Sequence, residues 1–407
     1  MTFDAPGASA TFDALGASEK PDALGASATP ESRSVTEALA DRARRFGPIR
    51  FDELMDAALY APGAGFYESG HGAGGHGADF LTSPELGPLF GAVLANALDS
   101  WWTELGLPDP FVVIEAGAGR GTLAASILAA APQCAAALHY LLVERSAAGR
   151  EAQSTRLALE PPAQVLGSVI VGDEDEPPMP LRRTGPIVAS LQDLPAGRFT
   201  GVVLANELLD NLAVRLLERG EDDGWSEVHC DHRGQEVLVV AAASVVAQAQ
   251  GLAPEAVARA RIALQGQAQQ WLRRALGCLA EGRVVVIDYV SSTPSMASRP
   301  WTDWLRTYRG HGRGGHPLAL LGAQDITCEV AVDQLAAVVP LSANQSQAEF
   351  LAAHGLDELV SAARRTWTER VPIGDLEALK ARSRISEGAA LVDPTGLGAF
   401  RVMQWRR

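Results

Sequence analysis

The residues best placed for chemistry lie in one short stretch, Glu115-Ala-Gly-Ala-Gly-Arg-Gly121, which follows a run of four apolar residues. That apolar run predicts a buried strand, and the alanine-rich run from Thr122 to Ala131 predicts a helix behind the glycines. Gly117, Gly119 and Gly121 lack the Cβ atoms that would hold a ligand away from the backbone. The first turn of the helix adds unpaired N–H groups. Strand, glycine loop and helix in this order are typical of a nucleotide-like cofactor site in an open α/β sheet.

The spacing of the glycines distinguishes between cofactors. A dinucleotide fingerprint, G-x-G-x-x-G, would need its third glycine at position 122, where this chain has Thr122. Glu115 stands at the strand end, where its charge would repel a diphosphate and hold a cationic amino group. We therefore expect S-adenosylmethionine as the cofactor, because its head carries an ammonium and a sulfonium but no phosphate. The same residues disfavour an oxidoreductase that uses a nicotinamide dinucleotide.

Two further acids follow predicted strands. The strand that begins at His139 ends at Glu144, and the strand Ile187 to Leu191 is followed by Asp193. In doubly wound sheets an acid at the first position accepts both ribose hydroxyls, because a carboxylate offers two acceptors in one plane. An acid at the second position can accept from an adenine amino group. An ordinary turn at the strand end explains Asp193 equally well.

The fourth predicted strand lies in the segment Gly201 to Asp210, with Asn206, Glu207 and Asp210 just past its carboxyl end. In this architecture that edge of the sheet faces the cofactor. These three residues are therefore candidates for the reacting end of the site. Capping of a following helix by Asn206 and its acidic neighbours is the alternative explanation.

A fourth group of polar residues precedes a predicted helix from Leu86 to Leu105. These residues either line a ligand or cap that helix. They are Asp79, Thr82, Ser83 and Glu85.

No metal site is predicted. His71 and His76 lie in a glycine-rich loop without a carboxylate or cysteine at compatible spacing. The group His229, Cys230 and His232 is better explained by a hairpin, because neighbouring strand residues point to opposite faces of a sheet.

Composition narrows the class of protein. The chain has 407 residues, a net charge of -15 and a pI near 5.0, which disfavour nonspecific binding to nucleic acid or to an anionic membrane. Its four cysteines form no C-x-x-C pair, so we expect neither a zinc ribbon nor a disulfide framework. No apolar run approaches the roughly 20 residues that span a bilayer, and the N-terminus lacks a signal-peptide pattern. We expect a cytoplasmic protein without membrane insertion.

We divide the chain into five parts. They are a repeat tail expected to be disordered (1–33), a helical N-terminal and lid region (34–105), a cofactor-binding core (106–210), an inserted meander and helix (211–280), and the rest of the core with an inserted substrate-side segment at 291–330 (281–407).

Several local predictions are specific enough to be checked. They are a short strand from Gln164 to Val171, a long helix from Pro254 to Ala280, a polar turn at Asp325 to Thr327, a helix from Gln345 to His354, and a last strand from Phe400 to Trp405 that pairs antiparallel at the sheet edge.

Taken together, these motifs resemble the MidA-like class I S-adenosylmethionine-dependent methyltransferases. The resemblance runs from about Phe46 to Arg407. It is carried by Asp52 to Tyr60, Gly65 to Tyr67, Asp79 to Glu85, Glu115 to Leu123, Ala205 to Glu207 with Asp210, and Asp325 to Thr327.

The resemblance implies a fold, a cofactor and an activity. The fold is α/β and Rossmann-like: a seven-stranded, mostly parallel sheet with a helical N-terminal pre-domain and an inserted α+β subdomain. The cofactor loop falls on Glu115 and its three glycines, the ribose acid on Glu144 and the adenine-side acid on Asp193, while Asp79 to Glu85 resembles a lid. Because the family includes a mitochondrial complex I assembly protein that dimethylates an arginine, the expected substrate is an arginine-bearing protein.

The chain also departs from the family pattern. Ala78 stands where members usually have glycine. Asp210-Asn-Leu-Ala213 stands in place of D-A-L-P, and Asp288-Tyr-Val290 stands in place of D-Y-G. The motifs therefore support the cofactor side more fully than the substrate side.

For an arginine acceptor the chemistry asks for carboxylates. A guanidinium is always protonated in water, and a carboxylate fork can grip two of its N–H groups and leave the other nitrogen facing the methyl group. Glu207 and Asp210 are the candidates, because positions i and i+3 share one face of a helical turn. Asn206 would hold the acceptor or the cofactor amino group. A non-catalytic assembly factor that binds the cofactor, a small-molecule methyltransferase and a homodimer stay open.

Overall fold

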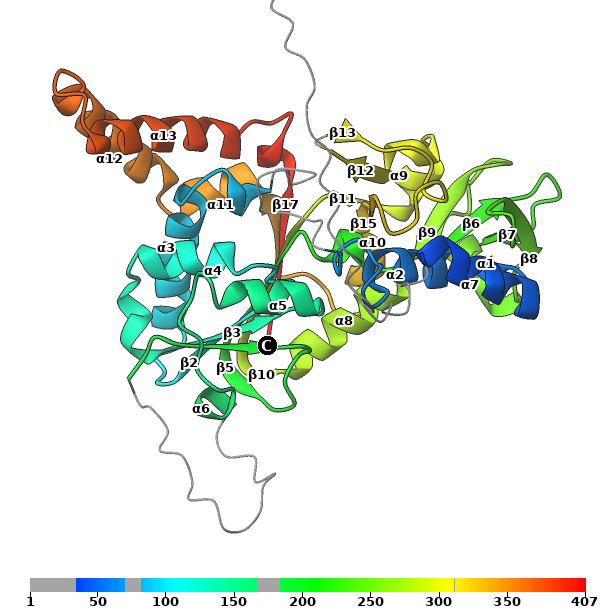
Figure 1. The fold of residues 1–407 in the computed structure, drawn as a ribbon, viewed down its shortest axis with the longest axis horizontal. Coiled ribbons are helices and arrows are strands. Elements are labelled where there is room, and N and C mark those ends of the chain that lie inside the picture. The colour runs from blue at the N-terminus through cyan, green and yellow to red at the C-terminus, as the bar shows by residue number, and fades with distance from the viewer. Residues whose placement is uncertain (1–33, 70–81, 167–183, 311) are drawn as a thin grey trace, which may run out of the picture. The chain divides into compact units, whose positions relative to one another are not determined.

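The computed structural model describes residues 34–69, 82–166, 184–310 and 312–407 (Figure 1). The predictions for the repeat tail 1–33, for Asp79 and for His71 and His76 fall outside these ranges. The division of the chain into five parts stays a prediction.

A seven-stranded sheet forms the centre of the described chain and carries the site (Figure 1). Its order is β16 (Ala343–Ser346), β17 (Arg401–Arg406), β10 (Leu279–Asp288), β5 (Phe199–Asn206), β2 (Phe111–Ala116), β3 (Leu138–Val143) and β4 (Ile187–Leu191). Only β17 runs against the others, since it pairs antiparallel with both neighbours and the remaining pairs are parallel. The predicted mostly parallel α/β sheet is confirmed.

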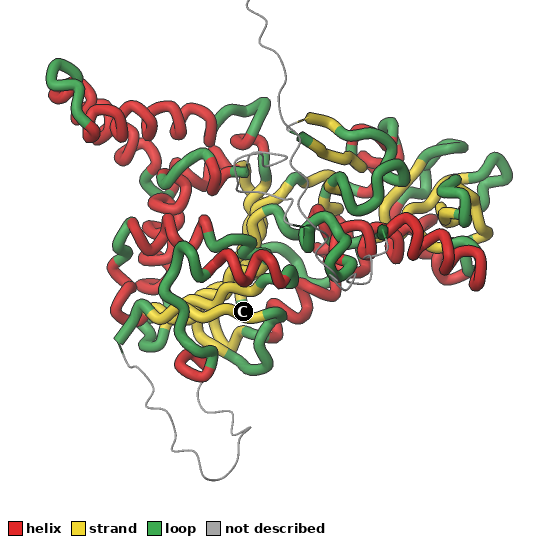
Figure 2. Tube along the Cα trace, viewed as in Figure 1, coloured by secondary structure: helices red, strands yellow, loops and turns green. Residues whose placement is uncertain are grey.

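Helices cover both faces of this sheet, as Figure 2 shows. On one face Val113 and Leu204 pack with α3 (Leu89–Glu104) and α4 (Thr122–Ala129). On the other face Ile114 and Val203 pack with α8 (Gly266–Gly277) and α6 (Ala163–Leu166). Because successive strand residues point to opposite faces, a strand buried on both sides has to be apolar throughout. This accounts for the continuous apolar run before Glu115.

A second sheet of five strands stands beside the first. It is built from β1 (Ile49–Arg50), β6 (Arg215–Arg219), β7 (Trp225–Cys230), β8 (Glu236–Val240) and β9 (Arg261–Leu264). Helix α2 (Phe51–Tyr60) packs its buried face, including Met55, against Leu216 of this sheet. Helix α1 (Val35–Phe46) precedes it and begins with a capping box at Ser34. The predicted meander is confirmed and gains two strands, β1 and β9.

The predicted long helix Pro254 to Ala280 is wrong. Residues Arg261–Leu264 form β9, and the helix α8 begins only at Gly266. All four residues of β9 are buried, and Arg261 makes ion pairs with Glu218 of the neighbouring strand β6 and with Glu236 of β8. Pairing with β6 and these ion pairs override a local sequence that fits a helix as well as a strand.

Four other local predictions differ from the structure. Residues Asp325–Cys328 form the strand β14 rather than a turn, since they pair with β12 (Leu305–Arg309). Residues Ala163–Leu166 form the helix α6 where a strand was expected. The strand β16 occupies the start of the expected helix from Gln345, which leaves α11 (Gln347–Ala353). The last strand, β17, lies inside the sheet, because β16 takes the edge.

The remaining described elements connect and cover these sheets. They are α5 (Ala147–Gln153), α7 (Ala243–Leu252), α9 (Thr293–Ala297), α10 (Val332–Ala336), α12 (Leu356–Arg370), α13 (Leu376–Leu391), β11 (Val290–Ser291), β13 (Gly312–Arg313), β15 (Val330–Ala331), and the short 3-10 turns η1 (Ser83–Glu85), η2 (Gln133–Ala137), η3 (Leu209–Asn211), η4 (Trp301–Asp303) and η5 (Leu397–Ala399).

Candidate active site

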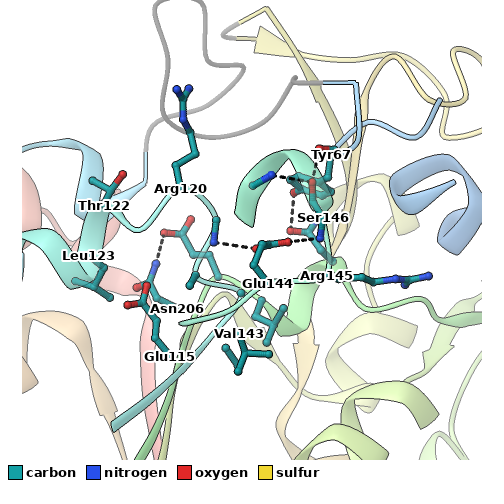
Figure 3. A pocket seen from close by; sticks show the side chains of 18 of the residues that line it. Tyr67, Glu115, Arg120, Thr122, Leu123, Val143, Glu144, Arg145, Ser146 and Asn206 are labelled. Atoms are coloured by element: carbon teal, nitrogen blue, oxygen red, sulfur yellow. Dashed lines mark hydrogen bonds between the residues drawn. The ribbon is translucent and has the colours of Figure 1, made fainter. Parts of the chain in front are cut away.

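A pocket of about 880 Å³ opens at the carboxyl ends of β2, β3, β4 and β5 (Figure 3). Nine of the predicted site residues line it. They are Thr82, Glu85, Glu115, Gly117, Gly119, Glu144, Asp193, Asn206 and Glu207. Ser83, Gly121 and Asp210 lie in the surrounding structure instead and are absent from its lining. The parallel strands explain the gathering, because they bring residues from distant parts of the chain to one edge.

The glycine loop needs its glycines for backbone geometry. Gly117 and Gly119 have φ of 72° and 50°, which is the left-handed region that side chains rarely adopt. A Cβ on Gly117 would stand 3.0 Å from Leu208 Cδ1, whereas a Cβ on Gly119 would meet no described atom within 4 Å. Position 119 therefore borders open space that a ligand can fill. Gly121 faces Leu157 and precedes α4 as its N-cap residue.

Glu115 is the acid at the base of the pocket. Only 4% of its surface is exposed, and Oε2 accepts a hydrogen bond of 2.6 Å from the Tyr140 hydroxyl. Burial is the main cause that raises the pKa of Glu115 to about 7, and the charge of Glu144 acts in the same direction. A cation bound beside it would restore the ionised form.

Glu144 is held by the backbone on both sides. Gly119 donates to its Oε2 at 2.8 Å and Ser146 donates to its Oε1 at 2.7 Å (Figure 3). Burial raises the pKa of Glu144, and these two bonds oppose that shift. The carboxylate is thereby fixed between the glycine loop and α5, with further lone pairs free for a ligand.

Asp193 lies at the exposed end of the pocket. Its Oδ1 accepts from the Leu194 amide at 2.8 Å, and its Oδ2 forms an ion pair of 2.7 Å with Arg274. Arg274 and Trp271 line the same end from α8, a helix whose start the sequence analysis misplaced.

Asn206 and Glu207 stand at the end of β5 and face the pocket. Asn206 Nδ2 donates to Glu207 Oε1 at 3.1 Å, while its buried Oδ1 has no donor within the described ranges. Glu207 has a φ of 50°, an uncommon conformation for a residue with a side chain. Burial, with Asp210 next in importance, raises the pKa of Glu207 to about 8.

Asp210 lies behind these two residues. It is 4% exposed and sits in the turn η3, and its Oδ1 has no donor among the residues that the structure describes. Burial and the charges of Asp288 and Asp325 raise the pKa of Asp210. The expected pairing of Glu207 and Asp210 on one helical face is replaced by a short 3-10 turn with Asp210 outside the lining.

Of the polar residues before α3, two line the pocket and one lies behind it. Thr82 and Glu85 line the pocket, and burial raises the pKa of Glu85. Ser83 is fully buried and its hydroxyl donates to Gln347 Oε1 of α11 at 3.2 Å. Ser83 therefore ties the segment to the core.

Tyr67, Asn211 and Asp325 form a hydrogen-bonded group at the pocket that was not predicted from the sequence. The Tyr67 hydroxyl lies 3.0 Å from Asn211 Oδ1 and 3.2 Å from Asp325 Oδ1, and Asn211 Nδ2 donates to Asp325 Oδ1 at 3.0 Å. The Tyr67 carbonyl accepts from Ser146 Oγ at 3.0 Å. The motifs Gly65 to Tyr67 and Asp325 to Thr327 were noticed in the sequence, but no spacing rule predicts that they meet.

The lining suits a positively charged adenosyl cofactor. The glycine at 119 leaves room beside the backbone, and five carboxyl groups line the pocket. Asn206 offers a buried acceptor without a donor in the described part of the chain. Arg120, a basic residue at the tip of the loop, also lines the pocket and suits a carboxylate. Within the described ranges no group of three or more His, Cys, Asp or Glu side chains is arranged to hold a metal.

Comparison with known proteins identifies the class. Residues 93–350 match the family model described as "Putative S-adenosyl-L-methionine-dependent methyltransferase". The chain belongs to this family of methyltransferases that use S-adenosylmethionine, and the predicted cofactor and MidA-like resemblance are confirmed.

Particular relatives refine this assignment. The chain is 28% identical over 319 residues to the protein arginine methyltransferase NDUFAF7 homolog, mitochondrial, of Drosophila melanogaster, covering 73% of this chain and 68% of the relative. It is 27% identical to NDUFAF7 of Danio rerio, covering 80% and 78%. A protein from Burkholderia thailandensis solved with bound S-adenosyl-homocysteine is 28% identical, with 92% of both chains covered and a TM-score of 0.70.

The predicted cytoplasmic location is wrong on this comparison. The named arginine methyltransferase relatives, from Drosophila melanogaster to Homo sapiens, are mitochondrial proteins. The inference from cysteine spacing and from the absence of a signal-peptide pattern does not distinguish these compartments. No helix in the described ranges is long and apolar enough to cross a membrane.

Proposed function

We propose that this methyltransferase transfers a methyl group from S-adenosylmethionine to an arginine side chain of a protein. The observation that carries the proposal is the pair Asn206 and Glu207 at the end of β5, where a half-buried carboxyl with a raised pKa borders the cofactor pocket. The relatives named as protein arginine methyltransferases support the same substrate class.

The pocket residues divide the cofactor between them. Glu115 would hold the ammonium group, Glu144 the ribose hydroxyls and Asp193 the adenine amino group, with Gly117 and Gly119 giving access to the backbone. Thr82 and Glu85 would close the pocket from the N-terminal side, and Ser83 would anchor their segment to α11. When bound, the cofactor supplies a methyl group already activated by a sulfonium.

Glu207 would act on the acceptor. As a carboxylate it accepts two N–H groups of the guanidinium, which draws positive charge away from the nitrogen that faces the methyl group. Methyl transfer would form a nitrogen–carbon bond as the carbon–sulfur bond of the sulfonium breaks and S-adenosyl-homocysteine leaves, and the proton released from that nitrogen would go to Glu207. Entry of the cation favours the ionised carboxyl, because an opposite charge nearby lowers the pKa of an acid.

Asn206 and Asp210 would support that step. Asn206 donates to Glu207 Oε1 and so fixes the orientation of the carboxyl. Its Oδ1 is left to accept from the substrate or from the cofactor ammonium. Asp210 adds negative charge behind Glu207, which favours a bound cation over a neutral acceptor.

Transfer of labelled methyl from S-adenosylmethionine to proteins and metabolites of a cell lysate tests the proposal. Label in a protein fraction that needs the purified enzyme is the expected result. Label in small molecules would assign a metabolite as the acceptor, and the absence of label would favour a cofactor-binding assembly factor. Either outcome contradicts transfer to a protein arginine.

A further inference from the structure

Asp288 is a fully buried acid that the proposed chemistry does not use. It ends β10, next to the carboxyl end of β5 in the centre of the sheet, and none of its surface is exposed. Burying a carboxylate is costly unless hydrogen bonds replace its water. A buried acid at this position therefore calls for a specific set of donors.

The donors are backbone amides of the turn η3, which follows Glu207, and of Tyr289. Asp288 Oδ2 accepts from Leu209 at 2.9 Å and from Asp210 at 3.3 Å. Its Oδ1 accepts from the Tyr289 amide at 2.9 Å. Two of the three bonds reach across from β10 to η3, some 79 and 78 residues away along the chain.

The same junction holds Glu207 in its unusual backbone conformation. The Glu207 amide donates to the Ile287 carbonyl at 2.8 Å, directly before Asp288, and φ of Glu207 is 50°. A left-handed φ in a residue with a side chain persists only where the surroundings impose it. The bond from Ile287 fixes one side of Glu207, and the bonds from Asp288 fix the turn on the other side.

Among the described residues, no positively charged side chain forms a salt bridge with Asp288. Glu207 and Asp210 face it from the end of β5 and η3, and Asp325 lies beside Asp210. Arg401, its partner in β17, directs its guanidinium to Asn344, and Arg306 near Tyr289 pairs with Glu329. Across the described residues no salt bridge reaches Asp288, so the backbone donors alone offset its burial.

From this geometry we infer that Asp288 is a positioning residue for methyl transfer: by accepting from the amides of Leu209 and Asp210 it fixes the turn η3 directly behind Glu207, and so fixes the position of Glu207 at the acceptor. The inference rests on the proposed function, since it assumes that Glu207 binds the substrate. Asp288 itself is absent from the pocket lining, so it acts through the turn.

The substitution Asp288→Asn tests this, because the side chain keeps its size while one acceptor oxygen becomes a donor. An amide cannot accept from both η3 and Tyr289, so one set of bonds is lost. The matched control is Asp231→Asn, in the hairpin between β7 and β8. Asp231 Oδ1 also accepts from two backbone amides, Arg233 at 2.8 Å and Gln235 at 2.9 Å, but lies away from the pocket lining.

Hydrogen exchange gives a readout that does not depend on turnover. In Asp288→Asn the amides of residues 207–211 should exchange about ten-fold faster than in the wild type. In Asp231→Asn the remaining oxygen can still accept both bonds, so residues 207–211 and 231–235 should keep the protection of the wild type. Unchanged protection at 207–211 in folded Asp288→Asn would overturn the inference, even if the wild type proves to methylate something other than arginine. Should that variant not fold, Asp288→Ser, which keeps one acceptor, is measured in its place.

Kinetics separates positioning from general damage. With a protein acceptor labelled by the wild type, kcat of Asp288→Asn should fall about 100-fold, since small misplacements of reacting groups cost that much. Affinity for S-adenosyl-homocysteine should stay as in the wild type. The rise of kcat/KM with pH should also move to lower pH, because removing one negative charge lowers the pKa of Glu207 and Asp210. An equal loss of cofactor affinity, or an unmoved pH profile, would contradict a positioning role.

Discussion

Glu115 is buried and Glu207 is half-buried at the same edge of the sheet, and their surroundings differ. Glu115 is tied to the Tyr140 hydroxyl at the base of the pocket, while Glu207 borders Asn206 and other acids. In the proposed function, Glu115 would hold the ammonium group of the cofactor and Glu207 would hold the guanidinium group of the substrate. Their separate substitution should therefore give different losses.

Replacing Glu207 by glutamine should abolish transfer and spare cofactor binding. The amide cannot take the proton or balance the guanidinium charge, and we expect kcat to fall about 10²- to 10⁴-fold, the usual contribution of a positioned base. Calorimetry with S-adenosyl-homocysteine should give an affinity close to that of the wild type. Lost binding together with preserved turnover would show that Glu207 belongs to the cofactor side.

The same substitution should change how stability depends on pH. Folding raises the pKa of Glu207 from 4.5 to about 8, so the folded chain holds a proton that the unfolded chain releases. The stability linked to this proton is present below pH 4.5 and is lost as the pH rises through about 8. Relative to the wild type, Glu207→Gln should therefore gain up to about 4 kcal/mol between pH 5 and pH 9. Denaturant titrations at the two pH values measure this, and an equal difference at both would contradict the assignment.

At the scale of elements, the glycine loop provides a clean comparison. Gly119 and Gly234 both have positive φ, and a Cβ at either position would meet no described atom within 4 Å. Replacement by alanine should cost each about 1–2 kcal/mol of stability from backbone strain. Only Gly119→Ala should also weaken S-adenosylmethionine binding, by about ten-fold or more, which is about 1.4 kcal/mol. Equal affinities in the two variants would mean that position 119 does not contact the cofactor.

Tyr67 connects the N-terminal segment to the core and offers a second test at this scale. Its hydroxyl contacts Asn211 and Asp325, while its ring stacks on that of Tyr60 with the ring centroids 5.4 Å apart. Tyr67→Phe keeps the stack and removes the hydroxyl, so kcat should fall about five- to ten-fold for one lost hydrogen bond. Tyr60→Phe, which removes the hydroxyl of the other ring in the stack, serves as the control, and a similar loss there would show that the effect is not specific to the bonds of Tyr67 with Asn211 and Asp325.

How far the sequence predicts these elements depends on how local their causes are. The apolar run before Glu115 and the glycines behind it are local signals, and strand, loop and helix lie as expected. The strand Arg261–Leu264 is not local, because burial and the ion pairs of Arg261 with Glu218 and Glu236 select it over a helix. The contact of Tyr67 with Asp325 joins residues 258 apart, which no periodicity reveals.

At the scale of the whole molecule, the order of strands explains why the site is where it is. Residues from β2, β3, β4 and β5 reach one pocket because these strands are parallel neighbours. The single reversed strand, β17, lies on the far side of β10, away from the cofactor loop. The net charge of -15 adds a long-range attraction for a basic, arginine-bearing partner.

The proposed function depends most directly on which amino acid receives the methyl group. Protein labelled by the purified enzyme with radioactive S-adenosylmethionine can be hydrolysed and its labelled amino acids separated. We predict label in methylated arginine with the wild type and a loss of that label with Glu207→Gln. Label in another amino acid, or methylated arginine undiminished in the variant, would contradict the account.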